Sequence, residues 1–295
     1  MISVIIPTYN REAVLMRSVM SVLDQTESDL ELIVADDCST DGTAALIRGI
    51  DDPRVRYLCL DHNQGACAAR NAGIDAARGE WIAFQDSDDK WAPDKLARMM
   101  AVAKETGADV CFHRLRRHYP GNRPDALFPE LSGSRFIPRE EILCYAMIST
   151  QTIFCKRAVC MEHRFDPKVR KAQDYDWAVR ASRDFRFFYA DEVLTDQYFQ
   201  TDSISAKGIR VQMETRQYFL EKYRGEAEQN PQFAVYQLKI IAKDKTLLGE
   251  KATEEYARIY RLEGGVSNKA KAILARLGVL PLLYKLRGDH RQKLP

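Results

Sequence analysis

Three aspartates, Asp86, Asp88 and Asp89, crowd together directly behind the short apolar run Trp81 to Phe84. Carboxylates packed this closely repel one another, and one pKa rises, unless a cation lies among them. Hard oxygen ligands on a tight turn suit Mg²⁺ or Mn²⁺, which keep coordination positions open for the phosphate oxygens of a substrate. The pattern therefore predicts a divalent metal site. The alternative is a solvated turn whose acids cap the next helix.

Other polar clusters follow the ends of earlier apolar runs. Thr8, Tyr9 and Asn10 come after the first run, and Asp36 and Asp37 come after the second. In an open parallel sheet, ligands bind outside the carboxyl ends of the strands. The three clusters are therefore expected to meet at one edge of a sheet, with the aspartates behind Phe84 among them.

The elements that must hold these residues alternate along the first half of the chain. Short β-branched runs and helical patterns follow one another, which indicates an α/β fold with a mostly parallel sheet covered by helices. Helices are expected after Asn10, which we interpret as a cap, from Gly65 to Ala77, and from Gln173. The expected strands are 3–6, 31–35, 55–60, 81–84, 109–112, 185–190 and 193–199.

Later parts of the chain lose this alternation. The stretch from Arg114 to Ser149 contains repeated Pro and Gly, so we expect loops that face the substrate and set its identity. After Ser205 the composition becomes helical and charged. We therefore predict a catalytic domain over residues 1–205 and a helical C-terminal region over 206–295.

Composition narrows the class of protein. The 295 residues carry 44 basic and 42 acidic side chains, a formal net charge of +2, so no global field points to nucleic acid as a partner. The seven cysteines contain no C-x-x-C pair and are expected to be free thiols. There is no export signal at the start and no long apolar run, which predicts a cytoplasmic protein.

Four motifs in order carry a resemblance to a known family. They are V-I-I-P-T-Y-N at 4–10, A-D-D-C-S-T-D-G-T at 35–43, G-A-C-A-A-R-N-A-G at 65–73 and F-Q-D-S-D-D-K-W-A-P-D-K-L at 84–96. Together they resemble the family 2 glycosyltransferases with the GT-A fold. The segment K-A-Q-D-Y-D-W-A-V-R at 171–180 resembles the part of that family that carries the catalytic base. The resemblance covers about two thirds of the chain.

The resemblance implies an inverting transfer of a sugar from a nucleotide donor, usually a UDP-sugar, to an acceptor hydroxyl. The diphosphate that leaves develops negative charge, and Mn²⁺ or Mg²⁺ held by Asp88 and Asp89 would stabilise it. Asp89 is the expected direct ligand, while Asp88 lies toward the ribose and the metal. Asp86 is assigned to the nucleotide-sugar site or to the turn itself.

The same resemblance assigns the general base to Asp174. A positioned base removes the proton of the acceptor hydroxyl and contributes roughly 10² to 10⁴ in rate. Gln173 stands where many members of the family have glutamate, and Asp176 is the second candidate. The alternative is that both acids only favour the positive end of a helix.

Further residues are expected to bind the nucleotide sugar. Tyr9 would stack on the base and Asp37 would accept the imide proton of uracil. Pro7 and Thr8 set the loop that follows the first strand, and Arg70 would reach the diphosphate. Each assignment has an alternative. Pro7 and Thr8 would only mark the exit of the strand, Asp37 would belong to a helix cap near Ser39, and Arg70 would form a surface ion pair. Trp91 beside the acidic motif is a candidate for sugar stacking or, more often, a packing residue.

The end of the chain, residues 269–295, mixes basic side chains with leucines. This pattern suits a helix on an anionic membrane surface. The resemblance implies a saccharide or lipid-linked saccharide acceptor in the synthesis of polysaccharide, lipopolysaccharide or capsule, and such a helix would hold the enzyme near it. A helix that docks on protein explains the pattern equally well, and Gly278 and Pro281 interrupt it.

Two other functions compete with the transferase hypothesis. A sugar-phosphate nucleotidyltransferase also combines a nucleotide-binding sheet with acidic metal sites, but no Gly-rich phosphate loop follows the first strand here. A receiver-like signalling domain uses acids at strand ends, but it would leave the second half of the chain without a role.

Overall fold

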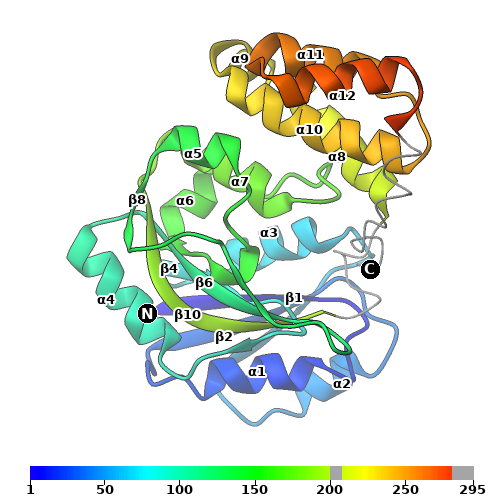
Figure 1. Cartoon of the computed structure of the whole chain (residues 1–295). Coiled ribbons are helices and arrows are strands. Elements are labelled where there is room, and N and C mark those ends of the chain that lie inside the picture. The colour runs from blue at the N-terminus through cyan, green and yellow to red at the C-terminus, as the bar shows by residue number, and fades with distance from the viewer. Residues whose placement is uncertain (200–207, 281–295) are drawn as a thin grey trace. The chain divides into compact units, whose positions relative to one another are not determined.

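The computed structural model describes residues 1–199 and 208–280 (Figure 1). Its contacts divide the chain into two units. The first comprises Met1–Ile142, Met147–Lys168 and Gln173–Phe199, and the second comprises Leu143–Ala146, Val169–Ala172 and the chain from Gln200 onward. The predicted boundary at residues 205 and 206 lies outside the described residues.

The first unit is built on one mixed sheet. Its strands are β1 (Ile2–Thr8), β2 (Leu30–Asp36), β3 (Val55–Cys59), β4 (Trp81–Phe84), β5 (Lys90–Trp91), β6 (Val110–His118), β7 (Ala126–Phe128), β8 (Arg135–Ile137), β9 (Phe154–Lys156) and β10 (Phe187–Tyr198). The order is β3-β2-β1-β4-β9-β6-β10-β5, with β7 beside β6 and β8 beside β10. The pairs β1/β2, β2/β3, β1/β4 and β6/β10 are parallel, whereas β9 runs antiparallel to both β4 and β6.

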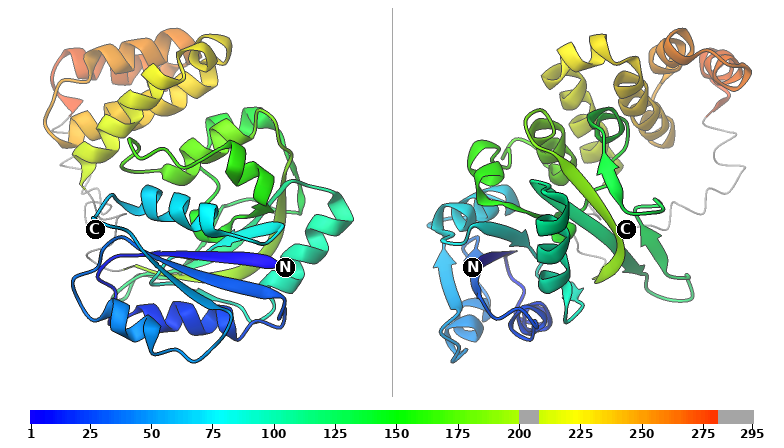
Figure 2. Two further views of the ribbon diagram at one scale, coloured as in Figure 1. Left: turned by 180° about the vertical axis from the view of Figure 1, so that it is seen from behind. Right: turned by 90° about the vertical axis from the view of Figure 1, so that its left-hand side faces the viewer.

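Successive side chains of each strand point to opposite faces of the sheet, and the apolar ones form a buried layer on each face. Val4 and Ile6 pack in the layer that contains residues of α1 (Leu15–Leu23), α2 (Thr43–Arg48) and α4 (Lys95–Thr106). Ile5 packs in the opposite layer, with residues of α3 (Ala66–Ala76), α5 (Arg139–Cys144), α6 (Arg157–Glu162) and α7 (Gln173–Ala181). Figures 1 and 2 show α1 and α2 on one face and α3 on the other.

The small residues of α3 explain how closely it approaches the sheet. A side-chain carbon placed on Gly73 would lie 2.5 Å from Cγ2 of Ile5. Only glycine therefore permits this distance between α3 and β1. Because Arg70 is one helical turn earlier on α3, the close packing also fixes its position above the sheet.

The predicted elements of the first half are largely confirmed, with three corrections. Asn10 is not a helix cap, because it has a φ of 50° and α1 begins only at Leu15. The stretch 114–149, expected to consist of loops, also contains regular elements, since β6 continues to His118 and β7, β8 and α5 follow. The strands expected at 185–190 and 193–199 form one strand, β10, with shifts in register after Ala190 and Val193.

The described part of the second unit is helical beyond residue 208, as predicted. Its helices are α8 (Ile209–Lys222), α9 (Arg224–Gln229), α10 (Pro231–Leu247), α11 (Thr253–Glu263) and α12 (Val266–Arg276). Asn230 caps α10, because its side chain accepts a hydrogen bond from the backbone N–H of Gln232 and Pro231 occupies the first turn. A core of α10 and α11 residues, including Leu238 and Ile259, holds the unit together. Within the described ranges, no helix is long and apolar enough to cross a membrane.

Candidate functional site

The acidic motif lies at the carboxyl ends of the strands, between β4 and β5. The backbone N–H of Gln85 still bonds to Ile5 of β1, at 3.0 Å, so the loop leaves the sheet only after this residue. Helix α1 then holds the loop backbone. Arg17 donates to the carbonyl of Asp88, and the hydroxyl of Ser18 donates to the carbonyl of Asp89 at 2.7 Å. The loop is thus fixed by its backbone, which leaves its side chains to face different surroundings.

Asp88 is the acid that has the properties of a metal ligand. Burial and the negative charge of Asp86 raise the pKa of Asp88 to about 6. Within residues 1–199 and 208–280, no other residue donates a hydrogen bond to its carboxylate. A half-buried carboxylate that lies beside a second acid and forms no ion pair with a described residue fits a hard divalent ion, and the charges of Arg11 and Arg17 favour its ionised form.

Asp89 has different surroundings. Its side chain is 1% exposed, and its two oxygens accept hydrogen bonds from Nε2 of Gln151 at 2.9 Å and from the backbone N–H of Tyr198 at 3.0 Å. The carbonyl of Gln151 in turn accepts from Nζ of the buried Lys95 at 2.6 Å. Asp89, the acid expected to be the direct ligand, therefore connects the acidic loop to the end of β10.

Asp36 and Asp37 also have partners within the protein. Both oxygens of Asp37 accept hydrogen bonds at 2.7 Å from the backbone N–H groups of Gln64 and Gly65, directly before α3. The oxygens of Asp36 accept from Ser39 and from the hydroxyl of Tyr57, each at 2.5 Å for the closest atom. These aspartates hold the loops that surround the strand ends.

The residues at the exit of β1 divide into buried and exposed ones. Pro7 and Thr8 belong to the strand, in register with Ala35 and Asp36, and both are buried. Tyr9 follows with 44% of its surface exposed. Of the three, Tyr9 is the side chain available to a ligand.

Arg70 joins two parts of the site. One terminal nitrogen lies 3.1 Å from Oδ1 of Asp86, and the other donates to Oε1 of Gln173 at 2.7 Å. Arg70 itself is 5% exposed. It therefore connects the acidic loop to the first residue of α7, the helix that carries Asp174.

The two candidate bases on α7 differ sharply in their surroundings. Asp176 is fully buried, and its Oδ2 accepts hydrogen bonds from Arg180 at 3.1 and 3.0 Å. Asp174 is half-buried in the first turn, where its carboxylate accepts from the backbone N–H of Tyr175 at 2.8 Å. The ion pair commits Asp176 to structure, and Asp174 remains the better placed acid.

Comparison with known proteins identifies the family. Residues 3–161, more than half of the chain, match the model of glycosyl transferase family 2. The chain belongs to this family. Over 177 residues it is 39% identical to the UDP-Glc:alpha-D-GlcNAc-diphosphoundecaprenol beta-1,3-glucosyltransferase WfgD of Escherichia coli, covering 60% of this chain and 68% of WfgD. The succinoglycan biosynthesis protein ExoO of Rhizobium meliloti is 46% identical over 114 residues, 39% of this chain, which spans 33% of ExoO.

Solved structures give the same fold. The structure of S. aureus TarS 1-349 with UDP-GlcNAc superimposes with a TM-score of 0.66 at 18% identity, covering 97% of this chain and 91% of that one. The predicted GT-A fold is therefore confirmed. The family match also favours the transferase over the nucleotidyltransferase and receiver hypotheses.

Trp91 of this glycosyltransferase lies in the core. It is 2% exposed, pairs with Thr195 through β5 and β10, and has Nζ of Lys95 3.5 Å from the centre of its ring. The structure thus supports packing, the alternative to sugar stacking. Lys95 and Gln151 are parts of the site whose roles the sequence pattern did not indicate, because their burial depends on strands distant in sequence.

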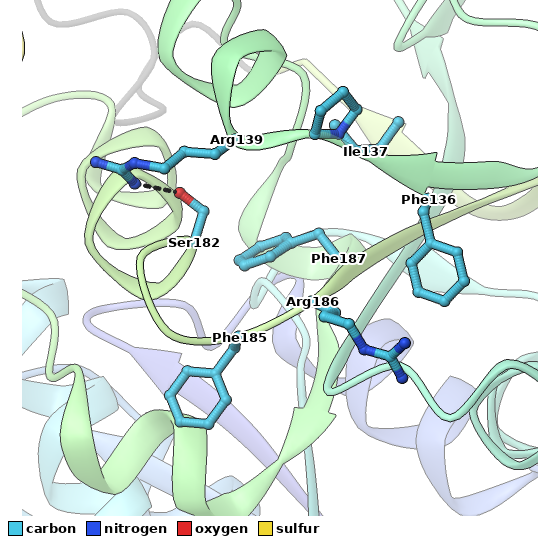
Figure 3. Close-up of a pocket in the computed structure, with 8 residues that line it drawn as sticks. Phe136, Ile137, Arg139, Ser182, Phe185, Arg186 and Phe187 are labelled. Atoms are coloured by element: carbon cyan, nitrogen blue, oxygen red, sulfur yellow. Dashed lines mark hydrogen bonds between the residues drawn. The ribbon is translucent and has the colours of Figure 1, made fainter. Parts of the chain in front are cut away.

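Two other features lie away from the acidic loop. Glu162, His163 and Asp184 bring ligand-type atoms within 4.8 Å of one another, but both acids are exposed and His163 already bonds to Asp184 at 3.1 Å. A cavity of about 360 Å³ lies at the opposite, amino end of β10, beside Phe187 (Figure 3). Its lining residues lie in or next to β8, the start of α5, the end of α7 and the start of β10 and include none of the predicted site residues, so this cavity is no part of the strand-end site.

Proposed function

We propose that this glycosyltransferase moves a sugar from a UDP-sugar to a hydroxyl of a saccharide acceptor with inversion, in a reaction that depends on Mn²⁺ or Mg²⁺. The observation that carries the proposal is the Asp88 carboxylate at the carboxyl edge of the sheet, which accepts no hydrogen bond from another described residue, whereas both oxygens of the more deeply buried Asp89 accept hydrogen bonds. Asp88 would hold the ion, with Asp86 beside it. The bound ion supplies positive charge that stabilises the departing diphosphate.

Asp89 takes a supporting role in this proposal. Its hydrogen bonds to Gln151 and Tyr198 fix the turn on which Asp88 lies. A ligand that must keep its geometry benefits from such partners, because misplacement by about an ångström lowers the rate substantially. We therefore assign direct metal binding to Asp88 and positioning to Asp89.

Asp174 acts as the general base. It accepts the proton of the attacking acceptor hydroxyl on the side of the donor sugar opposite the diphosphate, as inversion requires. Gln173 and Arg70 hold the start of α7 against the acidic loop, so the base and the leaving-group site keep a fixed relation. Arg70 thus contributes to binding of the donor sugar indirectly, by positioning the acidic loop and α7.

The nucleoside occupies the exits of β1 and β2. Tyr9 offers an exposed aromatic face for the base. Asp37 shapes the loop before α3 through two backbone hydrogen bonds, and a carboxylate oxygen has a second lone pair with which to accept the uracil imide proton. Pro7 and Thr8 fix the end of the strand from which Tyr9 projects.

The acceptor class follows from relatives that act in cell-surface polysaccharide synthesis. The E. coli relative is named for an acceptor sugar on diphosphoundecaprenol. By analogy, the acceptor here is a saccharide linked to a lipid through diphosphate. The donor sugar is glucose, galactose or an N-acetylhexosamine.

A lipid-linked acceptor places the enzyme at the inner surface of the cytoplasmic membrane. Val266, Ile273 and Leu277, at helical spacing i, i+7 and i+11, are 87, 51 and 68% exposed, and Lys269 and Arg276 flank them. An apolar stripe with basic neighbours suits an anionic lipid surface. The residues predicted for the rest of this tail, 281–295, lie outside the described residues.

Liposome sedimentation tests this contact. The full chain should pellet with anionic vesicles, and the pair Ile273→Ser and Leu277→Ser should reduce the pelleted fraction several-fold. Equal pelleting of both proteins would remove the membrane proposal without affecting the catalytic one.

A panel of nucleotide sugars tests the reaction itself. UDP release should depend on Mn²⁺ or Mg²⁺, on an acceptor and on one of the UDP-sugars. The Asp174→Asn protein serves as the control for uncatalysed donor hydrolysis. Turnover of GDP- or CDP-sugars only, or full activity in EDTA, would reject the proposal.

A further inference from the structure

Two arginines in the hairpin of β6 and β7 have no carboxylate within ion-pair distance among the residues described by the structure. The guanidinium of Arg117 lies 3.8 Å from the centre of the Phe128 ring, and its Nε donates to Oε1 of Gln197 at 3.1 Å. Arg123, which is exposed, lies 3.6 Å above the ring of Tyr119. Their terminal nitrogens are donors in a fixed planar fork.

Neighbouring basic side chains in the same hairpin do have acidic partners. Arg114 lies 2.9 Å from Asp191, and Arg116 lies 3.9 Å from Asp196. His118 bonds to Asp125 at 2.9 Å and to Asp196 at 2.8 Å. Among the described residues of this hairpin, Arg117 and Arg123 are thus the arginines without a carboxylate partner.

The strand pairing places Arg117 at the edge of the sheet that carries the acidic loop. Arg117 is in register with Gln197 of β10, one residue before Tyr198, whose N–H holds Asp89. A stack of Arg123, Tyr119 and Phe199 continues the edge, with ring centres of the two aromatics 4.8 Å apart.

Arg117 is also electrostatically coupled to the proposed base. Burial lowers the pKa of Arg117, while its interaction and side-chain hydrogen bond with Tyr119 and the negative charge of Asp174 raise it. Since Asp174 must face the acceptor hydroxyl, an anion bound by Arg117 would lie on the acceptor side and not at the metal. Half-burial strengthens such an interaction, because water screens it less.

We propose that Arg117 and Arg123 form a phosphate-binding subsite that holds the diphosphate of the acceptor. The inference rests on the proposed function for the identity of the acceptor, and it adds the residues that recognise it. Guanidinium groups suit this task because they bind two phosphate oxygens at once. Phe128 and Tyr119 support the two guanidinium planes from below.

Binding of farnesyl diphosphate, measured by titration calorimetry in the presence of saturating UDP and Mn²⁺, tests the subsite. UDP fills the donor site, so binding that remains reports a second site for diphosphate. We expect the wild type to bind farnesyl diphosphate. It should bind neither farnesol, which lacks the diphosphate, nor methyl glucuronide, whose anion is a carboxylate. Arg117→Gln and Arg123→Gln should each weaken binding about 10- to 100-fold, the effect of losing a hydrogen bond to a charged group.

Matched variants separate the subsite from general effects. Arg116→Gln removes a charge from the next position of the same strand and should leave the affinity within about twofold. Arg117→Lys keeps the charge but loses the fork, and should recover only part of the affinity. In transfer assays, Arg117→Lys should raise KM for the lipid-linked acceptor while leaving KM for the UDP-sugar unchanged.

Several results would overturn the subsite. They are equal binding of farnesol and farnesyl diphosphate, unchanged affinity in Arg123→Gln, which alters only an exposed side chain, or an equal loss in Arg116→Gln. Failure of the proposed function would look different, since UDP would then not bind with Mn²⁺ and no UDP-sugar would be turned over.

Discussion

Arg70 binds Asp86 and Gln173 at the same time, with contact distances of 3.1 and 2.7 Å. A single buried guanidinium therefore connects the acidic loop to the helix of the proposed base. Lysine cannot reproduce two diverging hydrogen bonds from one planar group. We expect Arg70→Lys to lower kcat about tenfold or more, with the melting temperature showing whether the fold persists.

Variants of Gln173 test the other end of this connection. Gln173→Glu keeps an oxygen for Arg70 and adds an opposite charge, so it should retain activity close to the wild type. Gln173→Ala leaves one nitrogen of the buried Arg70 without its partner and should lower kcat without weakening UDP binding. Equal activity of Gln173→Ala and the wild type would contradict the positioning role of Arg70.

The base assignment predicts a separation of binding from turnover. Asp174→Asn should keep the affinity for UDP and lose roughly 10² to 10⁴ in kcat, the contribution of a positioned general base. Calorimetry with UDP and a transfer assay measure the two quantities. Normal turnover in Asp174→Asn would show that the base lies elsewhere.

Asp176→Ala is the informative comparison on the same helix. Removal of Asp176 leaves Arg180 without its buried partner and should destabilise the fold by about 3 kcal/mol. Its effect should therefore appear in urea unfolding. A specific loss of kcat at unchanged stability would instead move the base to Asp176.

Asp89 and Asp88 should respond differently to the same substitution. Asparagine at position 89 places an NH₂ group against one of the two donors, Gln151 or Tyr198, and should lower the free energy of unfolding by about 1 to 3 kcal/mol. Asparagine at position 88 meets no such conflict and should abolish metal-dependent binding at unchanged or higher stability. The reverse result would restore Asp89 as the direct ligand.

The raised pKa of Asp88 has a consequence for the metal-free protein. Its folded pKa of about 6 lies above the ordinary value of 3.8, so the folded state binds this proton more tightly than the unfolded state does. Stability from this group is therefore fully present below pH 3.8 and is lost as the pH rises through 6. Relative to Asp88→Asn, the wild type should gain about 2 kcal/mol between pH 7 and pH 4.5.

Urea unfolding in EDTA at both pH values measures this difference. Comparison with Asp88→Asn cancels the groups remote from the acidic loop, whereas Asp86 and Asp89 interact with the charge of Asp88 and contribute to the measured difference. A flat difference, or one that falls toward pH 4.5, would show that Asp88 is not buried beside Asp86 as the structure has it.

Local patterns predicted the parts of this fold that depend on neighbours in sequence. The short β-branched runs at 3–6, 31–35 and 81–84 predict strands that the structure has at 2–8, 30–36 and 81–84, and the helix expected from Gly65 to Ala77 is α3 at Ala66–Ala76. β9 was missed because its short run Phe154–Lys156 forms a strand only between β4 and β6, which are distant in sequence. No local signal specifies such a pairing.

The site, like the fold, could be predicted only where it depends on residues that are close in sequence. Placing the clusters after Ile6, Ala35 and Phe84 at strand ends needed only the topology of a parallel sheet. Distinguishing Asp88 from Asp89 needed the positions of Gln151 and Tyr198, which lie more than 60 residues further along the chain. The sequence shows that acids are adjacent, but burial decides which of them has an oxygen available.

The most direct test of the account is the thermal shift produced by UDP with Mn²⁺ in the wild type and in Asp88→Asn. A ligand that binds only the folded state at 100 times its Kd stabilises by about 2.7 kcal/mol, which raises Tm by several degrees. We predict this rise for the wild type, its loss in EDTA, and its absence in Asp88→Asn. A rise of the same size in Asp88→Asn would contradict a metal and nucleotide site centred on Asp88.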